Sequence, residues 1–159
     1  MKLKRSILSI FALPFLLGAC AYESEAVGVG EWTKAIDRKI KVVEVKDVKT
    51  IPAVAKDFTA KSNYIVVLVE FFNESSSKVR LKYDDFELYK EDIKYSAKGL
   101  ESWYYSENQG DHSSLYTTVE IDSSADEQYY LVFETPTAHT EDSYQLRYTY
   151  SVVTVKINL

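Results

Sequence analysis

The stretch from Tyr64 to Phe72 constrains the fold more than any other part of this 159-residue sequence. It is apolar at every position except Glu70 and is rich in the β-branched residues Val and Ile. Nine residues make a long strand but a short helix, and β-branched side chains favour the strand. Because both faces of this strand would be apolar, we expect it to lie in the middle of a sheet.

Other segments alternate apolar and polar residues, which predicts strands with one face in water. The clearest are Lys39–Lys46, Val79–Tyr83, Leu115–Ile121, Tyr129–Phe133 and Tyr144–Tyr150. A short strand is expected near Trp32, and a hairpin is expected around the Lys90–Asp92 turn. The segment from Lys49 to Asn63, which contains Pro52, predicts a long connection. After Ser151 the apolar phase shifts by one residue, which predicts a β-bulge.

About seven to nine strands separated by turns, with almost no helical periodicity, predict an all-β fold. The expected architecture is an antiparallel immunoglobulin-like β-sandwich. Cys20 is the only cysteine, so the disulfide of true immunoglobulin domains is missing and the likeness concerns architecture alone.

The first nineteen residues have the organisation of a secretion signal. Lys2, Lys4 and Arg5 form a basic start, and an apolar run from Ile7 to Leu17 follows. That run is too short to cross a bilayer as a helix, but its length is typical of a signal peptide. Leu17-Gly18-Ala19-Cys20 resembles the lipobox of bacterial lipoproteins, which implies cleavage before Cys20 and attachment of diacylglycerol and further acyl chains to it.

Cleavage would leave a mature chain of 140 residues, enough for one domain with its own core. Residues 20–31 are small and acidic and predict a short tether, and residues 32–159 predict the β-sandwich domain. Loss of the three basic residues of the signal leaves 16 Lys and Arg against 24 Asp and Glu, a net charge of −8. Nucleic acid and anionic headgroups would repel such a domain, so nucleic-acid binding is not expected.

A series of short landmarks runs through this domain: Ile40–Val45, Tyr64–Val67 leading to Phe72–Ser76, Phe86–Leu88, and Leu131–Pro136. In this order they resemble a bacterial family of lipoproteins and secreted proteins of unknown function, similar in fold to mycobacterial immunoprotective secreted antigens. The family usually has a Pro-Gly-acidic turn where this chain has Ser123–Glu127. The resemblance implies a non-enzymatic role at the cell envelope and supplies no catalytic residues.

Residues able to do chemistry are few. The only histidines are His112 and His139, both in segments that predict loops. The run Asp111–Ser114 contains the residue types of a catalytic triad, but a triad is defined by geometry, and a solvated polar loop explains the run better. Asp122, Asp126 and Glu127 are weak candidates for calcium, because they lack the spacing of a calcium loop. We therefore expect no cofactor, no metal and no catalysis.

The best binding candidate is the region from Gly99 to Ser114, which shows no periodicity and predicts a loop. It holds Trp103, Tyr104, Tyr105 and His112. Aromatic loop residues offer large contact areas to a partner, although they also cap the ends of sandwiches by packing. The sequence leaves both roles open.

Taken together, the sequence predicts a lipid-anchored, non-catalytic envelope protein. The lipid would hold it on the cell membrane or the outer membrane, outside the cytoplasm. There it would bind an envelope protein or act as an accessory subunit. One alternative is a carbohydrate or small-ligand module that uses the aromatic loop. A less favoured alternative is an envelope hydrolase.

Overall fold

The computed structural model describes residues 22–110 and 118–159, which are mostly strands. The elements in chain order are β1 (Tyr22–Glu23), β2 (Thr33–Ala35), β3 (Arg38–Ile51), β4 (Phe58–Asn73), β5 (Val79–Lys82), a 3-10 turn (Tyr83–Asp85), β6 (Phe86–Lys90), β7 (Ile93–Ser96), α1 (Gly99–Gln109), β8 (Thr118–Ile121), β9 (Asp126–Thr135), β10 (Gln145–Tyr150) and β11 (Val153–Asn158).

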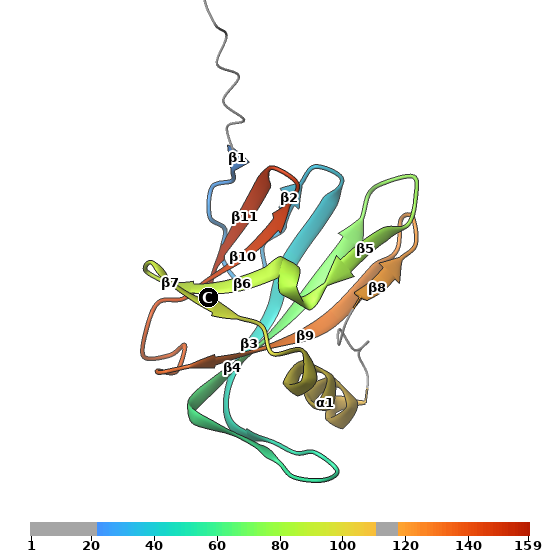
Figure 1. Ribbon diagram of the computed structural model, residues 1–159. Coiled ribbons are helices and arrows are strands. Elements are labelled where there is room, and N and C mark those ends of the chain that lie inside the picture. Colours follow the sequence, from blue (N-terminus) through green and yellow to red (C-terminus); the bar gives the residue numbers. More distant parts are fainter. Residues whose placement is uncertain (1–21, 111–117) are drawn as a thin grey trace, which may run out of the picture.

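Two sheets form the layers of a sandwich (Figure 1). One has the strand order β1-β11-β10-β6-β7, and the other has the order β2-β3-β4-β9. Strands β5 and β8 pair with each other as a small third sheet. The pairs are antiparallel except for β1, which runs parallel to β11. The predicted antiparallel β-sandwich is therefore confirmed.

The apolar run from Tyr64 to Phe72 lies within β4, which pairs with β3 on one side and β9 on the other. This strand is central, as its sequence predicted. Its residues Ile65, Val67, Val69 and Phe71 belong to the core between the two sheets. The alternate residues Tyr64, Val66 and Leu68 belong to a second apolar cluster with Tyr105 of α1 and Tyr130 of β9. The strand is apolar on both faces because a sheet covers one face and α1 lies over the other.

The predicted long connection from Lys49 to Asn63 is wrong in extent. Strand β3 continues to Ile51 and β4 begins at Phe58, so the two strands form one long hairpin whose turn contains Pro52. Thr50 pairs with Thr59 and Ile51 with Phe58. This end of the hairpin buries few side chains, chiefly Ile51, with Phe58 and Ala60 packed against the second apolar cluster, so its sequence shows little apolar alternation.

The predicted aromatic loop from Gly99 to Ser114 is corrected over most of its length, because Gly99–Gln109 is the helix α1. Gly110 ends the helix in the left-handed conformation, with φ 78°, which glycine adopts readily. The buried residues of α1 are Ser102, Tyr105 and Ser106. Two serines among these three leave no apolar stripe, so the usual helical pattern is missing from the sequence. His112 lies outside the described residues.

The predicted bulge after Ser151 is instead a hairpin. Strand β10 ends at Tyr150 and β11 begins at Val153, with Tyr150 paired to Val153 across a two-residue turn. Ser151 has φ 56°, which suits the tight turns that join two strands. Because paired residues point to the same face of a sheet, the two-residue turn explains why the apolar phase shifts there.

The chain is already paired to the sandwich at Tyr22, close to its predicted anchor. Tyr22 aligns with Val153 and Glu23 with Thr154 in the parallel pair of β1 and β11. Val27 then bridges to Ile157. Much of the segment expected to be a tether thus runs along the edge of one sheet. In the two described ranges, no helix is long and apolar enough to cross a membrane.

Candidate functional site

Helix α1 is held against β9 by a buried serine. The Ser102 hydroxyl donates to the carbonyl of Lys98 at 2.7 Å and accepts the amide hydrogen of Val132 at 2.9 Å. Tyr105 packs edge-on against Tyr130, with ring centroids 4.9 Å apart. Tyr105 is buried, and burial raises the pKa of its hydroxyl. The structure therefore gives Tyr105 a packing role beneath the helix.

The other two aromatic candidates connect α1 to the end of the β3–β4 hairpin. The rings of Trp103 and Tyr104 lie 4.6 Å apart, and Tyr104 lies 5.5 Å from Phe58 of β4. Asn108 adds a hydrogen bond to the carbonyl of Pro52 at 2.8 Å. Trp103 and Tyr104 are half-buried. These contacts hold the helix to the hairpin, so the aromatic side chains already stabilise the fold at this end of the molecule.

Next to α1, two edge strands of the sandwich meet once and then separate. Strand β7 is the last strand of one sheet and β9 is the last strand of the other. Ala97 bridges to Phe133, and the Lys98 amide donates to the Val132 carbonyl at 2.7 Å. Beyond that bridge lies a cleft of about 630 Å³. We call it the β7–β9 groove, and its lining residues are Lys61, Ser62, Lys94, Tyr95, Ser96, Ala97, Lys98, Glu134, Thr135 and Pro136.

The β7–β9 groove is basic although the protein is acidic. Three lysines line it, Lys61, Lys94 and Lys98, against the single carboxylate of Glu134. That carboxylate accepts the Lys61 amide hydrogen at 3.0 Å and lies 3.6 Å from the Lys98 ammonium. Lys94 also bonds Glu87 at 2.8 Å, which raises the pKa of Lys94 and keeps it protonated. An anionic group entering the groove would therefore meet an excess of positive charge.

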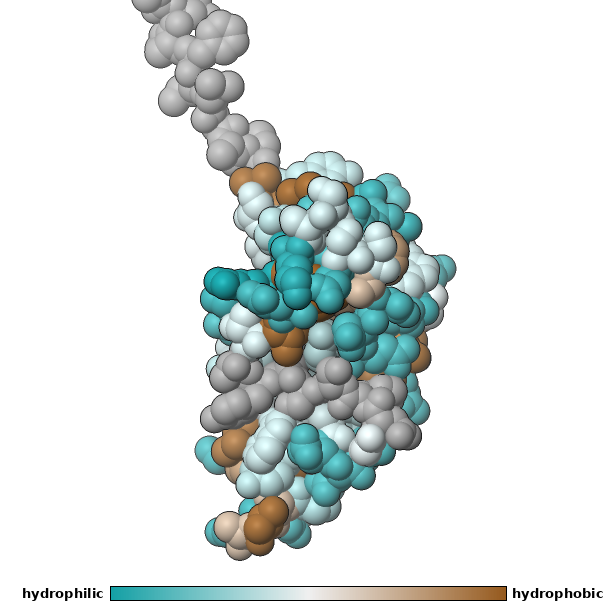
Figure 2. Space-filling model, turned by 90° about the vertical axis from the view of Figure 1, so that its right-hand side faces the viewer, coloured by the Kyte–Doolittle hydropathy of each residue, from teal (hydrophilic) through white to brown (hydrophobic). Residues whose placement is uncertain are grey.

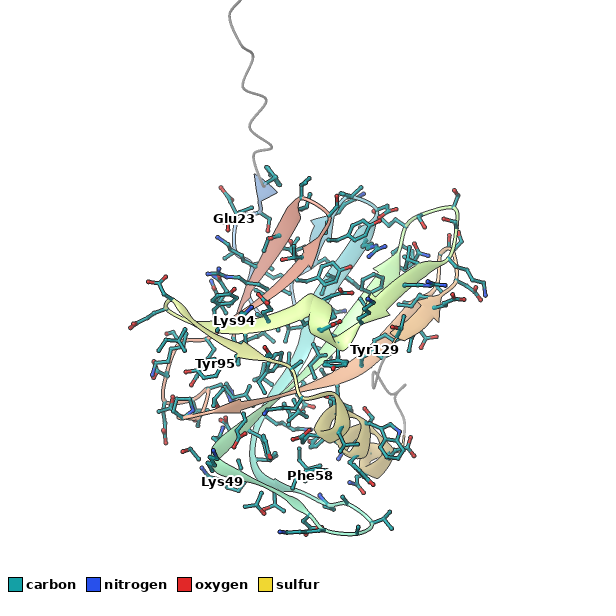
Figure 3. The ribbon with its side chains drawn as sticks, in the orientation of Figure 1. Glu23, Lys49, Phe58, Lys94, Tyr95 and Tyr129 are labelled. Carbon is teal, nitrogen blue, oxygen red and sulfur yellow. The ribbon has the colours of Figure 1, made fainter. Side chains whose placement is uncertain are left out.

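Backbone and aromatic groups complete the walls of the groove. Ser96 ends β7 on one wall, and Thr135 ends β9 on the other. Tyr95 stands beside Lys94 (Figure 3) and meets Tyr144 edge-on at 6.1 Å. Edge strands present backbone donors and acceptors along their open sides. A groove with such walls offers hydrogen bonds to an extended chain and positive charge to its side chains.

A carboxylate–imidazole pair joins β3 to the segment between β9 and β10. His139 Nδ1 is 2.6 Å from Asp47 Oδ2, and the His139 amide donates to Asp47 Oδ1 at 2.9 Å. Asn63 donates to the same oxygen at 2.7 Å. Burial alone would raise the pKa of Asp47, but these hydrogen bonds and the imidazole outweigh burial and lower it. The pair holds the segment between β9 and β10 against β3.

The acidic residues considered for calcium are not gathered into a site. Asp122 forms an ion pair with Lys78 at 2.7 Å, and Asp126 begins β9 opposite Phe72. Throughout the described ranges, no three His, Cys, Asp or Glu side chains are grouped so that they could hold a metal ion.

Sequence reasoning missed both the groove and the carboxylate–imidazole pair. The lysines of the groove occur singly in strands and turns, where lysine is common on solvated faces. His139 and Asp47 are 92 positions apart in the sequence. Only the pairing of the strands brings these groups together, so no local motif could have revealed them.

Comparisons with known proteins support the fold. No protein-family model and no curated protein matches the chain. Among solved structures, the chain is similar to the yjhA protein from Bacillus subtilis, with a TM-score of 0.60 and 19% identity over 84% of this chain and 98% of that one. It is also similar to ycdA of Bacillus subtilis, a protein proposed to be a lipoprotein, with a TM-score of 0.57 and 20% identity.

That second match covers 80% of this chain but 38% of ycdA. A third similar structure is MPT63, a secreted protein from Mycobacterium tuberculosis, with a TM-score of 0.53 and 11% identity over 84% of this chain and 95% of MPT63. The resemblance in fold to bacterial lipoproteins and secreted proteins, including a mycobacterial secreted protein, was inferred from the order of the strand motifs and is confirmed.

Proposed function

We propose that this chain is a lipid-anchored, non-catalytic protein of the bacterial envelope, and that it binds an extended acidic segment of an envelope protein in the β7–β9 groove. The observation that carries the proposal is the separation of two open strand edges beside three lysines. Extended peptides commonly bind by adding a strand to a sheet edge, with main-chain hydrogen bonds giving affinity and side-chain pockets giving specificity.

The choice of an acidic segment follows from charge complementarity. Lys61, Lys94 and Lys98 line the groove, whose one lining carboxylate is Glu134, whereas the mature chain as a whole carries a net charge of −8. Lys98 lies beside Glu134, and Lys94 is paired with Glu87. Opposite potentials across an interface steer the encounter and select among partners. Acidic side chains that alternate along a bound strand would all face one side, where the lysines could meet them.

The location outside the cytoplasm is supported by the lipobox-like end of the signal at Cys20. A fold shared with a secreted protein and with a protein proposed to be a lipoprotein agrees with it. The anchor has a direct test. Cys20→Ser should release the protein from the membrane fraction, and unchanged membrane retention would contradict lipid attachment.

The non-catalytic role is supported by the contacts of two carboxylates, Glu134 and Asp47, which are both engaged by neighbouring groups of the fold. The groove contains one carboxylate, Glu134, which is already engaged by the Lys61 amide and by Lys98. Glycoside hydrolysis uses two carboxylates that flank the bond to be cut. The Asp47 carboxylate accepts hydrogen bonds from the Asn63 side chain and the His139 amide, and it lies against the His139 imidazole. Each of these carboxylates is accounted for by contacts that hold the fold together.

Site-specific photo-crosslinking in intact envelopes tests the location of the partner. A crosslinking residue at Ser96, in the groove, should capture a discrete protein. The matched control is Ser77, an exposed serine in the turn between β4 and β5, outside the groove. Adding Lys94→Glu and Lys98→Glu should abolish the Ser96 adduct. The same adduct from Ser77, or an adduct unchanged by the charge reversals, would contradict binding in the groove.

A further inference from the structure

Three chain segments meet at the end of the sandwich where the N-terminus leaves it (Figure 1). Strand β1 lies beside the β10–β11 hairpin, and the Tyr22 amide donates to the Val152 carbonyl in the tip of that hairpin at 2.8 Å. The tip of the β2–β3 hairpin, at Ile36 and Asp37, stands at the same end. Helix α1 and the turn of the β3–β4 hairpin lie at the opposite end of the molecule.

Apolar side chains are exposed to solvent at this end of the molecule. Tyr22 is 64% exposed, Ile36 is 52% exposed and Val152 is 52% exposed. Figure 2 shows hydrophobic residues grouped where the N-terminal trace joins the domain. Ile and Val at the tips of tight hairpins are unusual, because such turns favour Asn, Asp and Gly.

Ile36 also has an unfavourable backbone conformation. Its φ is 59°, in the left-handed region that β-branched residues strongly avoid. Asn would adopt this conformation more readily and would keep the hairpin tip polar. Ile36 therefore costs the fold backbone free energy, and about half of its side chain stays exposed to solvent. A residue that opposes the local folding preference marks a functional constraint.

Three acidic side chains near these tips lie next to cations. Glu23 bonds Lys156, and Glu74 bonds both Lys34 and Lys39. Asp37 lies 3.7 Å from Arg38. This end therefore does not present the net negative charge of the whole domain to its surroundings. Neutralised charge around exposed apolar tips is suited to the polar headgroup layer of a membrane.

The short stretch of chain between Cys20 and β1 indicates that a membrane covers these hairpin tips. Cys20 precedes Tyr22 by two residues, which span at most about 7 Å when fully extended. If Cys20 carries lipid, Tyr22 is forced to the membrane surface, and the two hairpin tips are brought there with it. Tyrosine is enriched at that interface, because its ring is apolar and its hydroxyl is polar.

We propose that β1 and the tips of the β2–β3 and β10–β11 hairpins dock onto the bilayer that holds the lipid, with Tyr22, Ile36 and Val152 in the interfacial layer. This inference rests on the proposed lipid at Cys20. Docking orients the sandwich, so that α1 and the β3–β4 hairpin point away from the membrane.

Aqueous quenching of a fluorophore on the lipidated protein tests the docking. Because Cys20 is the only cysteine and its sulfur would carry lipid, Ile36→Cys or Val152→Cys provides a unique labelling site. The matched control is Val54→Cys, at an apolar residue that is 95% exposed in the β3–β4 turn at the opposite end. The proteins are reconstituted into vesicles of phosphatidylethanolamine and phosphatidylglycerol, and flotation reports whether the anchor holds.

In floating vesicles, labels at 36 and 152 should be quenched several-fold more slowly than the label at 54. On a Cys20→Ser background without vesicles, all three should be quenched at similar rates. Protein that floats but is quenched equally at all three sites would overturn docking and leave the anchor intact. Protein that fails to float would overturn the anchor and, with it, this inference.

The variant Ile36→Asn separates folding from docking. It should raise the melting temperature of the soluble domain, because Asn accepts the left-handed conformation more readily. On vesicles, it should speed quenching of a label at 152. A lower melting temperature would overturn the claim that Ile36 is not kept for folding. Unchanged quenching at 152 would overturn its role in docking.

Discussion

Two buried serines of the same helix should respond in opposite ways to the same substitution. Ser102 links α1 to β9, since its hydroxyl accepts the Val132 amide hydrogen at 2.9 Å. Ser106, one turn later, is also buried, but its hydroxyl has no hydrogen-bond partner among the described residues. Replacing either residue with alanine removes one oxygen atom from the same helix face, so the pair forms a matched comparison.

The magnitude follows from what each substitution leaves behind. Ser102→Ala leaves the buried Val132 amide without its acceptor, which costs about 1–3 kcal/mol of unfolding free energy. The Lys98 carbonyl keeps its bond from the Ser102 amide, at 2.9 Å, so it adds no penalty. Ser106→Ala removes a buried hydroxyl that gains no bond, so its effect should be near zero or stabilising.

Urea unfolding at neutral pH measures both free energies, and hydrogen exchange of the Val132 amide reports the bond itself. We expect the urea midpoint to fall in Ser102→Ala and exchange at Val132 to accelerate, with neither change in Ser106→Ala. Equal losses of stability in the two variants would refute the reasoning, because they would show that side-chain volume rather than the Val132 bond holds α1 in place.

Two further substitutions test other polar contacts of the fold. Asn73 is fully buried, and its side-chain amide donates to the carbonyls of Ser77, Ile121 and Asp122. Asn73→Ala should therefore lower the unfolding free energy, measured by urea titration, by roughly 3 kcal/mol. A loss below about 1 kcal/mol would contradict the role of Asn73 in joining two turns. Asp47→Asn should lower stability by about 1–3 kcal/mol at pH 7, because the carboxylate accepts bonds from Asn63 and His139. The pKa of Asp47 is lowered in the fold, so its contribution is present above the ordinary carboxyl pKa of about 4 and is lost as the pH falls through the lowered value. Unfolding experiments should therefore show the gap between wild type and Asp47→Asn closing in acid, and a gap that widens there would contradict this assignment.

The sequence predicted a strand correctly where apolar side chains are buried on both of its faces. The run from Tyr64 to Phe72 is apolar throughout because a facing sheet covers one side and α1 covers the other. The shift after Ser151 was seen correctly, but its cause was not. A two-residue hairpin and a bulge produce the same change of phase, and only the pairing of Tyr150 with Val153 distinguishes them.

Helix α1 was missed because its contacts with the sheet are largely polar. Ser102 binds through its hydroxyl, and Tyr105 is the one large side chain among the three buried residues of the helix. Helical periodicity depends on apolar burial, and this helix supplies little. Trp103 and Tyr104 were predicted to form a binding surface because the segment was interpreted as a loop. As parts of a helix, these side chains meet Phe58 and each other.

The groove could not be predicted, because it is a property of the path of two backbones. Lys94 and Lys98 precede α1, Lys61 lies in β4, and Glu134 lies in β9. Each looks like an ordinary solvated residue in its own segment. Their meeting depends on the bridge of Ala97 to Phe133 and on the separation of the strands beyond it. Lysines on edge strands also prevent unwanted pairing, so a test of binding must keep the edge charged.

The most direct test of the groove is an NMR titration of the protein with an acetylated, amidated octapeptide that alternates Glu and Thr. We expect shifts centred on the amides of Tyr95, Ser96 and Thr135. Lys94→Glu together with Lys98→Glu should weaken the affinity about tenfold, a loss of roughly 1.4 kcal/mol. These substitutions keep both edges charged. Lys78→Glu, which reverses an exposed paired lysine outside the groove, should leave the affinity unchanged. Shifts centred elsewhere, or equal weakening by Lys78→Glu, would contradict an acidic segment bound between β7 and β9.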